Sequence, residues 1–120
     1  MPSMDTLFLV KPGFQDPAFP GKDFYCWHCA LIEGVLTSFP ERAANLTVKR
    51  VAWPRPRSEV IDLVGEEHQS LPLLVLSEGS QSPDGTGRSP AASHARSFIA
   101  DKDAILQALT DRHGFPHPHP

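Results

Sequence analysis

The only two cysteines of the 120-residue chain, Cys26 and Cys29, are three positions apart and come just before an apolar run with helical spacing. That spacing places both of them at the start of a predicted helix. A helix N-terminus offers unpaired N–H groups and a partial positive charge, which favour a thiolate at the first cysteine. The sequence therefore predicts Cys26 as a nucleophile, with Cys29 as its partner in thiol chemistry.

Length and composition predict one domain spanning residues 1–120, because 40% hydrophobic residues suffice for a single core. We expect it to be cytoplasmic because the sequence shows neither a membrane segment nor an export signal. A net charge of −3 and scattered basic residues give no continuous basic face, so we expect no nucleic-acid partner. The longest apolar stretches have the length of a strand, which predicts no membrane segment, and the N-terminal residues lack the pattern of an export signal. In the cytoplasm a close cysteine pair is more often catalytic, redox-sensing or metal-binding than a structural disulfide.

Apolar runs and helical stripes predict the element order β-α-β-α-β-β-α. Residues 11–25 form a loop, residues 77–97 a flexible insertion and residues 115–120 a disordered tail. The predicted strands are Thr6–Val10, Thr47–Trp53, Leu71–Leu76 and Phe98–Ala100, and the helices run from the cysteines to Pro40, from an N-cap at Ser58 to Gly65, and from Asp101 or Asp103 to Gly114.

The connections predict an α/β fold with a four-stranded mixed sheet flanked by helices. The first two strands are joined through a helix and should pair in parallel by a right-handed crossover, while the last two should pair antiparallel. The unbroken apolar run Thr6–Val10 is typical of a central strand covered on both faces. Lys49 and Arg50 mark the second strand as an edge strand.

The element order, the Cys-x-x-Cys at a helix start and Pro72 at the entrance of the third strand resemble the thioredoxin-like superfamily, in a version of glutaredoxin size. Stretches 24–36, 52–57 and 69–76 are also similar to a bacterial domain-of-unknown-function family of that superfamily, family 3088, which implies no activity. The superfamily resemblance implies thiol–disulfide exchange. It also implies a cis bond before Pro72 and a backbone at Leu71 that pairs with a peptide or with glutathione.

The motif departs from that of thioredoxins, which read Trp-Cys-Gly-Pro-Cys where this chain reads Tyr25-Cys26-Trp27-His28-Cys29. A histidine before the second cysteine is similar to the disulfide-forming relatives, the DsbA and protein disulfide isomerase types. His28 can place a cation or a hydrogen-bond donor near the Cys26 sulfur, which favours thiolate and an easily reduced disulfide. Tyr25 and Trp27 are predicted to supply an apolar contact surface for the partner.

Glutathione is a further expectation of the resemblance. Segments 71–74 and 98–106 look like the parts of glutaredoxins and glutathione transferases that hold this peptide. The γ-glutamyl end would then lie at Asp101, and Lys11 could hold the other carboxylate, although Asp101 is also a good helix-capping residue. Glutathione enters as a co-substrate, and no other cofactor is predicted.

Three function classes stay open from the sequence. The leading hypothesis is an oxidoreductase that acts on protein or small-molecule disulfides, with Cys26 attacking, Cys29 resolving and His28 tuning. The second is a module that binds glutathione or a protein without turnover. The third is a metal protein, and the cysteines could instead be simple core thiols. Arg55 and Arg57 are expected in a solvated loop, no carboxylate is identified as a proton acceptor for Cys29, and the histidines available to a metal are His28, His68, His113, His117 and His119.

Overall fold

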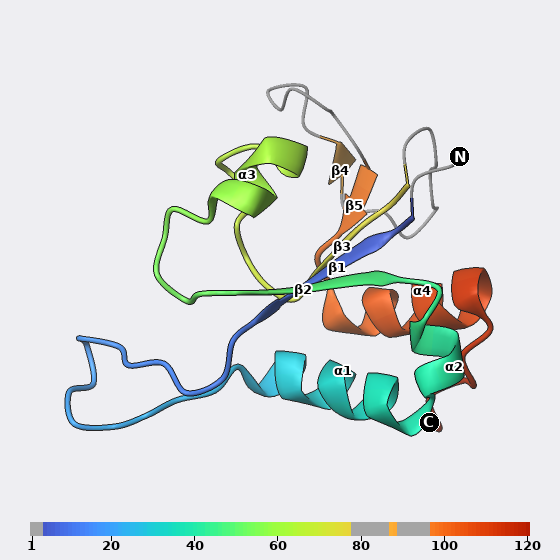
Figure 1. The fold of residues 1–120 in the computed structure, drawn as a ribbon, viewed down its shortest axis with the longest axis horizontal. Coiled ribbons are helices and arrows are strands. Elements are labelled where there is room, and N and C mark those ends of the chain that lie inside the picture. Colours follow the sequence, from blue (N-terminus) through green and yellow to red (C-terminus); the bar gives the residue numbers. More distant parts are fainter. Residues whose placement is uncertain (1–3, 78–86, 89–96) are drawn as a thin grey trace.

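The computed structural model describes residues 4–77, 87–88 and 97–120 of the chain. These residues form an α/β fold built on one mixed sheet with the strand order β2-β1-β3-β5-β4 (Figure 1). The elements in chain order are β1 (Thr6–Val10), α1 (Trp27–Ser38), α2 (Pro40–Ala43), β2 (Thr47–Val51), α3 (Ser58–Val64), β3 (Leu73–Val75), β4 (Gly87–Arg88), β5 (Ser97–Ile99) and α4 (Lys102–His113).

The strand pairings confirm the predicted topology. β1 pairs in parallel with β2, which lies at the sheet edge, and antiparallel with β3 on its other side. β3 in turn pairs antiparallel with β5. The sheet has one strand more than predicted, because β4 pairs with β5. A strand of only two residues carries no readable apolar pattern, so the sequence could not show it.

The sheet lies between two layers of helices (Figure 1). α1 and α4 cover one face, and α3 covers the other. Successive strand residues alternate between the faces: Leu7 and Leu9 contribute to the core under α1 and α4, and Phe8 to the core under α3. Cys29 belongs to the first of these cores, so the sequence motif is anchored in the interior by its second cysteine.

The first residue of α3 differs from the prediction. Arg57, and not Ser58, takes the N-cap position, and no side chain caps this helix. The reason is tertiary: the Arg57 N–H donates to the Gln69 side-chain oxygen at 2.7 Å, so a residue distant in sequence satisfies the backbone there. At the other end, Gly65 stops the helix at a positive φ of 92°, as predicted.

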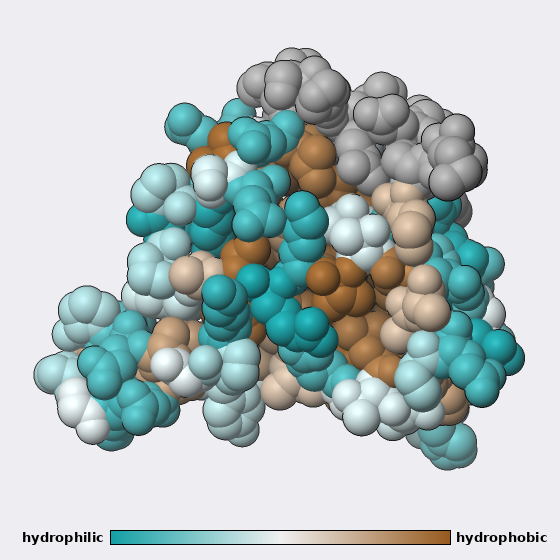
Figure 2. All heavy atoms as spheres, viewed as in Figure 1, coloured by the Kyte–Doolittle hydropathy of each residue, from teal (hydrophilic) through white to brown (hydrophobic). Residues whose placement is uncertain are grey.

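The segments between and after these elements are less regular. Residues 11–25 form a loop on the left of Figure 1, and in Figure 2 its surface is mostly hydrophilic. Most of the predicted flexible insertion, residues 77–97, lies outside the described residues. In the predicted tail, Phe115 is buried against the core and meets Phe39 edge to face. Among the described residues, no helix is long and apolar enough to cross a membrane.

A buried ionic cluster joins the start of β1 to the end of α4. The Asp5 side chain is 1% exposed and accepts hydrogen bonds from Arg112 at 2.6 and 2.8 Å, from His113 at 2.8 Å and from the Ser77 N–H at 2.7 Å. Burial alone would raise the pKa of Asp5, but the bonds from His113, Arg112 and Ser77 hold it well below its usual range. Ionised Asp5 therefore stabilises the fold.

We predict that Asp5→Asn lowers the free energy of unfolding by about 3 kcal/mol at pH 7, because it leaves the Arg112 charge without its partner. Because the folded pKa of Asp5 lies below the unfolded value of about 4, its stabilisation is complete above that value and falls as the pH drops below it. Urea denaturation at pH 7 and in acid measures both effects. Exposed Asp62→Asn is the control, and equal stability of the two variants would contradict the prediction.

Candidate functional site

Cys26 occupies the N-cap position of α1, with a backbone φ of −77° and ψ of 114°. Its Sγ accepts a hydrogen bond from the Cys29 N–H at 3.2 Å. This sulfur thus takes the place that a serine or aspartate oxygen holds in common N-caps, where it meets the partial positive charge of the helix end. The residue is partly exposed, and it also packs against the core under α1 and α4.

Cys29 is in a different environment, although both cysteines are free thiols. It is 2% exposed, and its Sγ accepts a hydrogen bond from the Val10 N–H at 3.5 Å. Burial raises the pKa of the Cys29 thiol to about 12, with further contributions from its hydrogen bond to Cys26 and from the negative charge of Glu33. The pair therefore consists of one partly exposed cysteine and one buried cysteine whose thiol is protonated.

Aromatic residues precede and follow Cys26 in the chain. Tyr25 and Trp27 are 65% and 67% exposed, which makes them the two most exposed large apolar side chains among the described residues. The His28 ring lies against the Trp27 ring, with a centroid separation of 3.9 Å. No hydrogen bond joins His28 to either sulfur within the described part of the chain. The tuning role of His28 stays a prediction.

Leu71 and Pro72 precede β3, and the peptide bond between them is cis, as the resemblance implied. Leu71 and Cys26 pack against the same core. Asp101 acts as the N-cap of α4, where its Oδ2 accepts a hydrogen bond from the Ala104 N–H at 2.9 Å. The helix-capping interpretation of Asp101 is therefore confirmed, and its predicted contact with glutathione stays a prediction.

The histidines considered as metal ligands are dispersed. His113 binds Asp5 in the ionic cluster, and His68 lies against Phe98 in the core under α3. Across residues 4–77, 87–88 and 97–120, no three His, Cys, Asp or Glu side chains gather in a way that could hold a metal ion.

Glu33 is a site residue that sequence reasoning missed. It follows Cys29 by four positions, so both side chains lie on one side of α1, and its negative charge contributes to the raised pKa of Cys29. Two hydrogen bonds of 2.7 Å from Arg50 of β2 fix the carboxylate. The four-residue spacing from Cys29 could have identified Glu33 from the sequence, because residues four apart in a helix lie on the same side. This is the carboxylate near the cysteines that the sequence alone did not identify.

Arg57 corrects a further expectation, because it is 8% exposed and does not lie in a solvated loop. Its guanidinium donates to the Trp53 carbonyl at 2.5 and 3.1 Å and to the Gln69 carbonyl at 2.5 Å. Trp53 stacks on Phe14 with a centroid separation of 5.2 Å. Arg57 thus connects the loop before β3 to the loop after β2, and through Trp53 to the loop that leads to Cys26.

Burial lowers the pKa of Arg57, and so does the neighbouring charge of Arg55, while the Cys29 and Cys26 sulfurs act in the opposite direction. No carboxylate forms an ion pair with Arg57 among the residues that the structure describes. The burial of this cation depends on segments that are distant in sequence, so sequence spacing could not show it.

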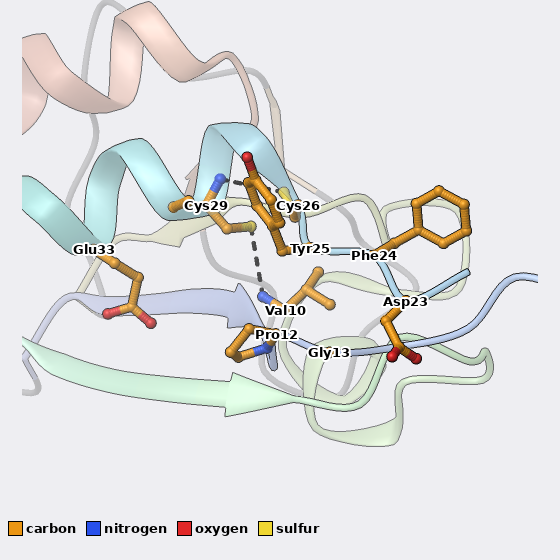
Figure 3. Close-up of a pocket in the computed structure, with 10 residues that line it drawn as sticks. Val10, Pro12, Gly13, Asp23, Phe24, Tyr25, Cys26, Cys29 and Glu33 are labelled. Carbon is orange, nitrogen blue, oxygen red and sulfur yellow. Dashed lines mark hydrogen bonds between the residues drawn. The ribbon is translucent and has the colours of Figure 1, made fainter. Parts of the chain in front are cut away.

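A groove opens beside the two cysteines, between α1 and the chain that follows β1 (Figure 3). Its volume is about 510 Å³. Figure 3 shows Glu33 at one end of the groove and Asp23 at the other, with the two sulfurs between them. The remaining lining is contributed by Val10, Pro12, Gly13, Phe24, Tyr25 and Ala30.

The model of a family described as "Protein of unknown function (DUF3088)" matches residues 4–117. No curated protein and no solved structure matches the chain.

Proposed function

We propose that this chain, which belongs to the DUF3088 family, is a cytoplasmic thiol–disulfide oxidoreductase with a thioredoxin-like fold of glutaredoxin size. The observation that carries the proposal is the asymmetry of the cysteine pair. Cys26 is partly exposed at the N-terminus of α1, and Cys29 keeps a buried, protonated sulfur one helical turn further on. A nucleophile and a resolving thiol need these two environments. The order of strands and helices and the position of Pro72 at the entrance of β3 support the proposed fold.

The reaction proceeds in two exchanges. The Cys26 thiolate attacks one sulfur of a disulfide, a bond forms between the two sulfurs, and the other half of the substrate leaves as a thiolate. Cys29 then gives up its proton and attacks the Cys26 sulfur, which forms the Cys26–Cys29 disulfide and releases the second half as a thiolate. The substrate gains two electrons, the protein loses two, and a dithiol reductant returns the protein to its starting state.

Side chains around the pair have separate roles in this proposal. His28 tunes Cys26, Tyr25 and Trp27 contact the partner, and the backbone at Leu71 and Pro72 positions it. Glu33, which Arg50 holds in place, adds its negative charge to the burial that keeps Cys29 protonated before the second exchange. In this proposal the exposed Tyr25 and Trp27 contact the partner that Cys26 attacks, and the buried Cys29 resolves the mixed disulfide.

We predict that the second exchange depends on pH through Cys29. Once Cys26 is in a mixed disulfide, its negative charge and hydrogen bond no longer act on Cys29, but burial still keeps the pKa of Cys29 high. The rate of resolution should therefore rise about tenfold per pH unit from about pH 7 to 9, as the thiolate fraction does. Stopped-flow reaction with Ellman's reagent resolves the two thiol releases, and a pH-independent second release would contradict this assignment.

The oxidoreductase proposal is tested by turnover of bis(2-hydroxyethyl) disulfide, a small neutral substrate, with dithiothreitol as the dithiol reductant. The expected result is multiple turnovers above the uncatalysed exchange, with the protein alternating between its dithiol and its intramolecular disulfide. A rate equal to that of the reductant alone would refute the proposal.

A further inference from the structure

The groove beside the cysteines has the dimensions of a small-molecule site. Its volume of about 510 Å³ falls in the range of ligand pockets, which is roughly 300–1,000 Å³. Cys26 and Cys29 both contribute to its lining. A group bound there would lie next to the sulfur that attacks the substrate.

The uncharged part of the lining is mainly apolar. Phe24 and Tyr25 are the aromatic residues of the lining, and Val10, Pro12 and Ala30 are its aliphatic ones. Phe24 is held in place by backbone hydrogen bonds with Phe14 at 2.7 and 3.0 Å, so its part of the lining is anchored. An aromatic or other apolar group would remove more of this surface from water than a polar group of the same size.

The charged part of the lining is acidic. Among the described residues that form the groove, Asp23 and Glu33 are the charged side chains, and no lysine, arginine or histidine is among them. Asp23 accepts a hydrogen bond from the Gln15 side-chain amide at 3.2 Å, which does not neutralise its charge. Glu33 is paired with Arg50. Asp23 therefore gives the groove negative charge, and among the described lining residues no cation is present to pair with an anionic ligand, which the groove disfavours.

We propose that this groove is the specificity pocket of the oxidoreductase, and that it selects disulfides bearing an aromatic group with neutral or positive charge over the anionic glutathione disulfide. The inference rests on the proposed function. It assigns the groove to the half of the disulfide that stays bonded to Cys26 after the first exchange. Leu71 and Pro72 do not line the groove, so its selectivity is separable from their contacts with a partner.

The test compares kcat/KM for four disulfides with dithiothreitol as reductant. Two are the symmetric disulfides of the dipeptide amides Phe-Cys-NH2 and Ala-Cys-NH2, which have equal charge and differ in the ring. Glutathione disulfide is the anionic substrate and tests the charge selection. Bis(2-hydroxyethyl) disulfide is neutral, lacks a ring, and measures disulfide exchange without a contribution from the pocket. We expect the Phe substrate to exceed the Ala substrate by about tenfold, as burial of a ring allows, and glutathione disulfide to be the poorest of the four.

Ala30→Phe places a ring in the groove from an exposed position of α1. It should reduce the preference for the Phe over the Ala substrate to about twofold or less, since the pocket is then filled. Thr37→Phe is the matched control, because it adds the same ring at an exposed position of the same helix outside the groove, and it should leave the preference unchanged.

The outcomes separate the two proposals. Turnover of bis(2-hydroxyethyl) disulfide without a preference for the Phe substrate, or a preference that Ala30→Phe leaves intact, would overturn the pocket and leave the oxidoreductase standing. Efficient use of glutathione disulfide would likewise overturn the proposed charge selection. Failure to turn over any of the four would overturn the oxidoreductase, and the pocket with it.

Discussion

Cys26→Ser should lose disulfide reduction almost completely, with kcat/KM falling about a thousandfold or more toward the uncatalysed background. A serine hydroxyl fits the N-cap of α1 and can accept the Cys29 N–H as the sulfur does, so helix capping survives the change. What disappears is the nucleophile, because a hydroxyl at this position remains protonated and does not exchange with disulfides. Turnover of bis(2-hydroxyethyl) disulfide measures the effect.

The control for Cys26→Ser is its fold and its stability. Because serine is a good N-cap residue, far-ultraviolet circular dichroism and urea denaturation should show a fold and stability close to those of the parent protein. Activity within about tenfold of the parent, in a variant that is folded to the same extent, would mean that Cys26 is not the attacking group.

Cys29→Ser should stop the reaction after the first exchange, which gives the second-largest effect. Cys26 still attacks the disulfide, but no second thiol remains to release the bound half, so a mixed disulfide on Cys26 accumulates. Intact-mass measurement after incubation with bis(2-hydroxyethyl) disulfide should find nearly all of the protein as the single adduct. Turnover with limiting dithiothreitol should fall about a hundredfold or more.

The control for this result is a double variant in which both cysteines are replaced by serine. The adduct must form in Cys29→Ser and be absent from the double variant in which Cys26 is also serine. If Cys29→Ser turned over at the parental rate, the buried thiol would have no part in the reaction, and exchange would proceed through Cys26 and external thiol alone. A trapped adduct that forms without Cys26 would contradict the assignment of the nucleophile.

Local patterns in the sequence predicted the elements that hold the cysteines. The apolar run of β1 and the helical stripe after Cys29 each reflect burial along one element, which spacing alone encodes. Asp101 at the start of α4 also follows a local rule, since its side chain bonds a backbone N–H three residues later. These features needed no knowledge of the rest of the fold.

Features that depend on contacts between distant segments were missed or wrongly placed. The burial of Arg57 depends on the carbonyls of Trp53 and Gln69, and the same Gln69 displaces the expected cap at Ser58. The groove depends on the two ends of the loop of residues 11–25, which line it together with the start of α1. Glu33 is the exception among the missed residues, since its spacing from Cys29 could have indicated a shared face of the helix.

The central claim is that Cys26 and Cys29 form a reversible redox pair, and equilibration across glutathione redox buffers tests it most directly. Intact-mass measurement after acid quenching counts free thiols and glutathione adducts at each ratio of reduced to oxidised glutathione. We predict a single two-electron transition between the dithiol and the intramolecular disulfide, with little mixed disulfide at equilibrium. Thiols that stay reduced across the whole series, or that stop at a stable glutathione adduct, would contradict the claim.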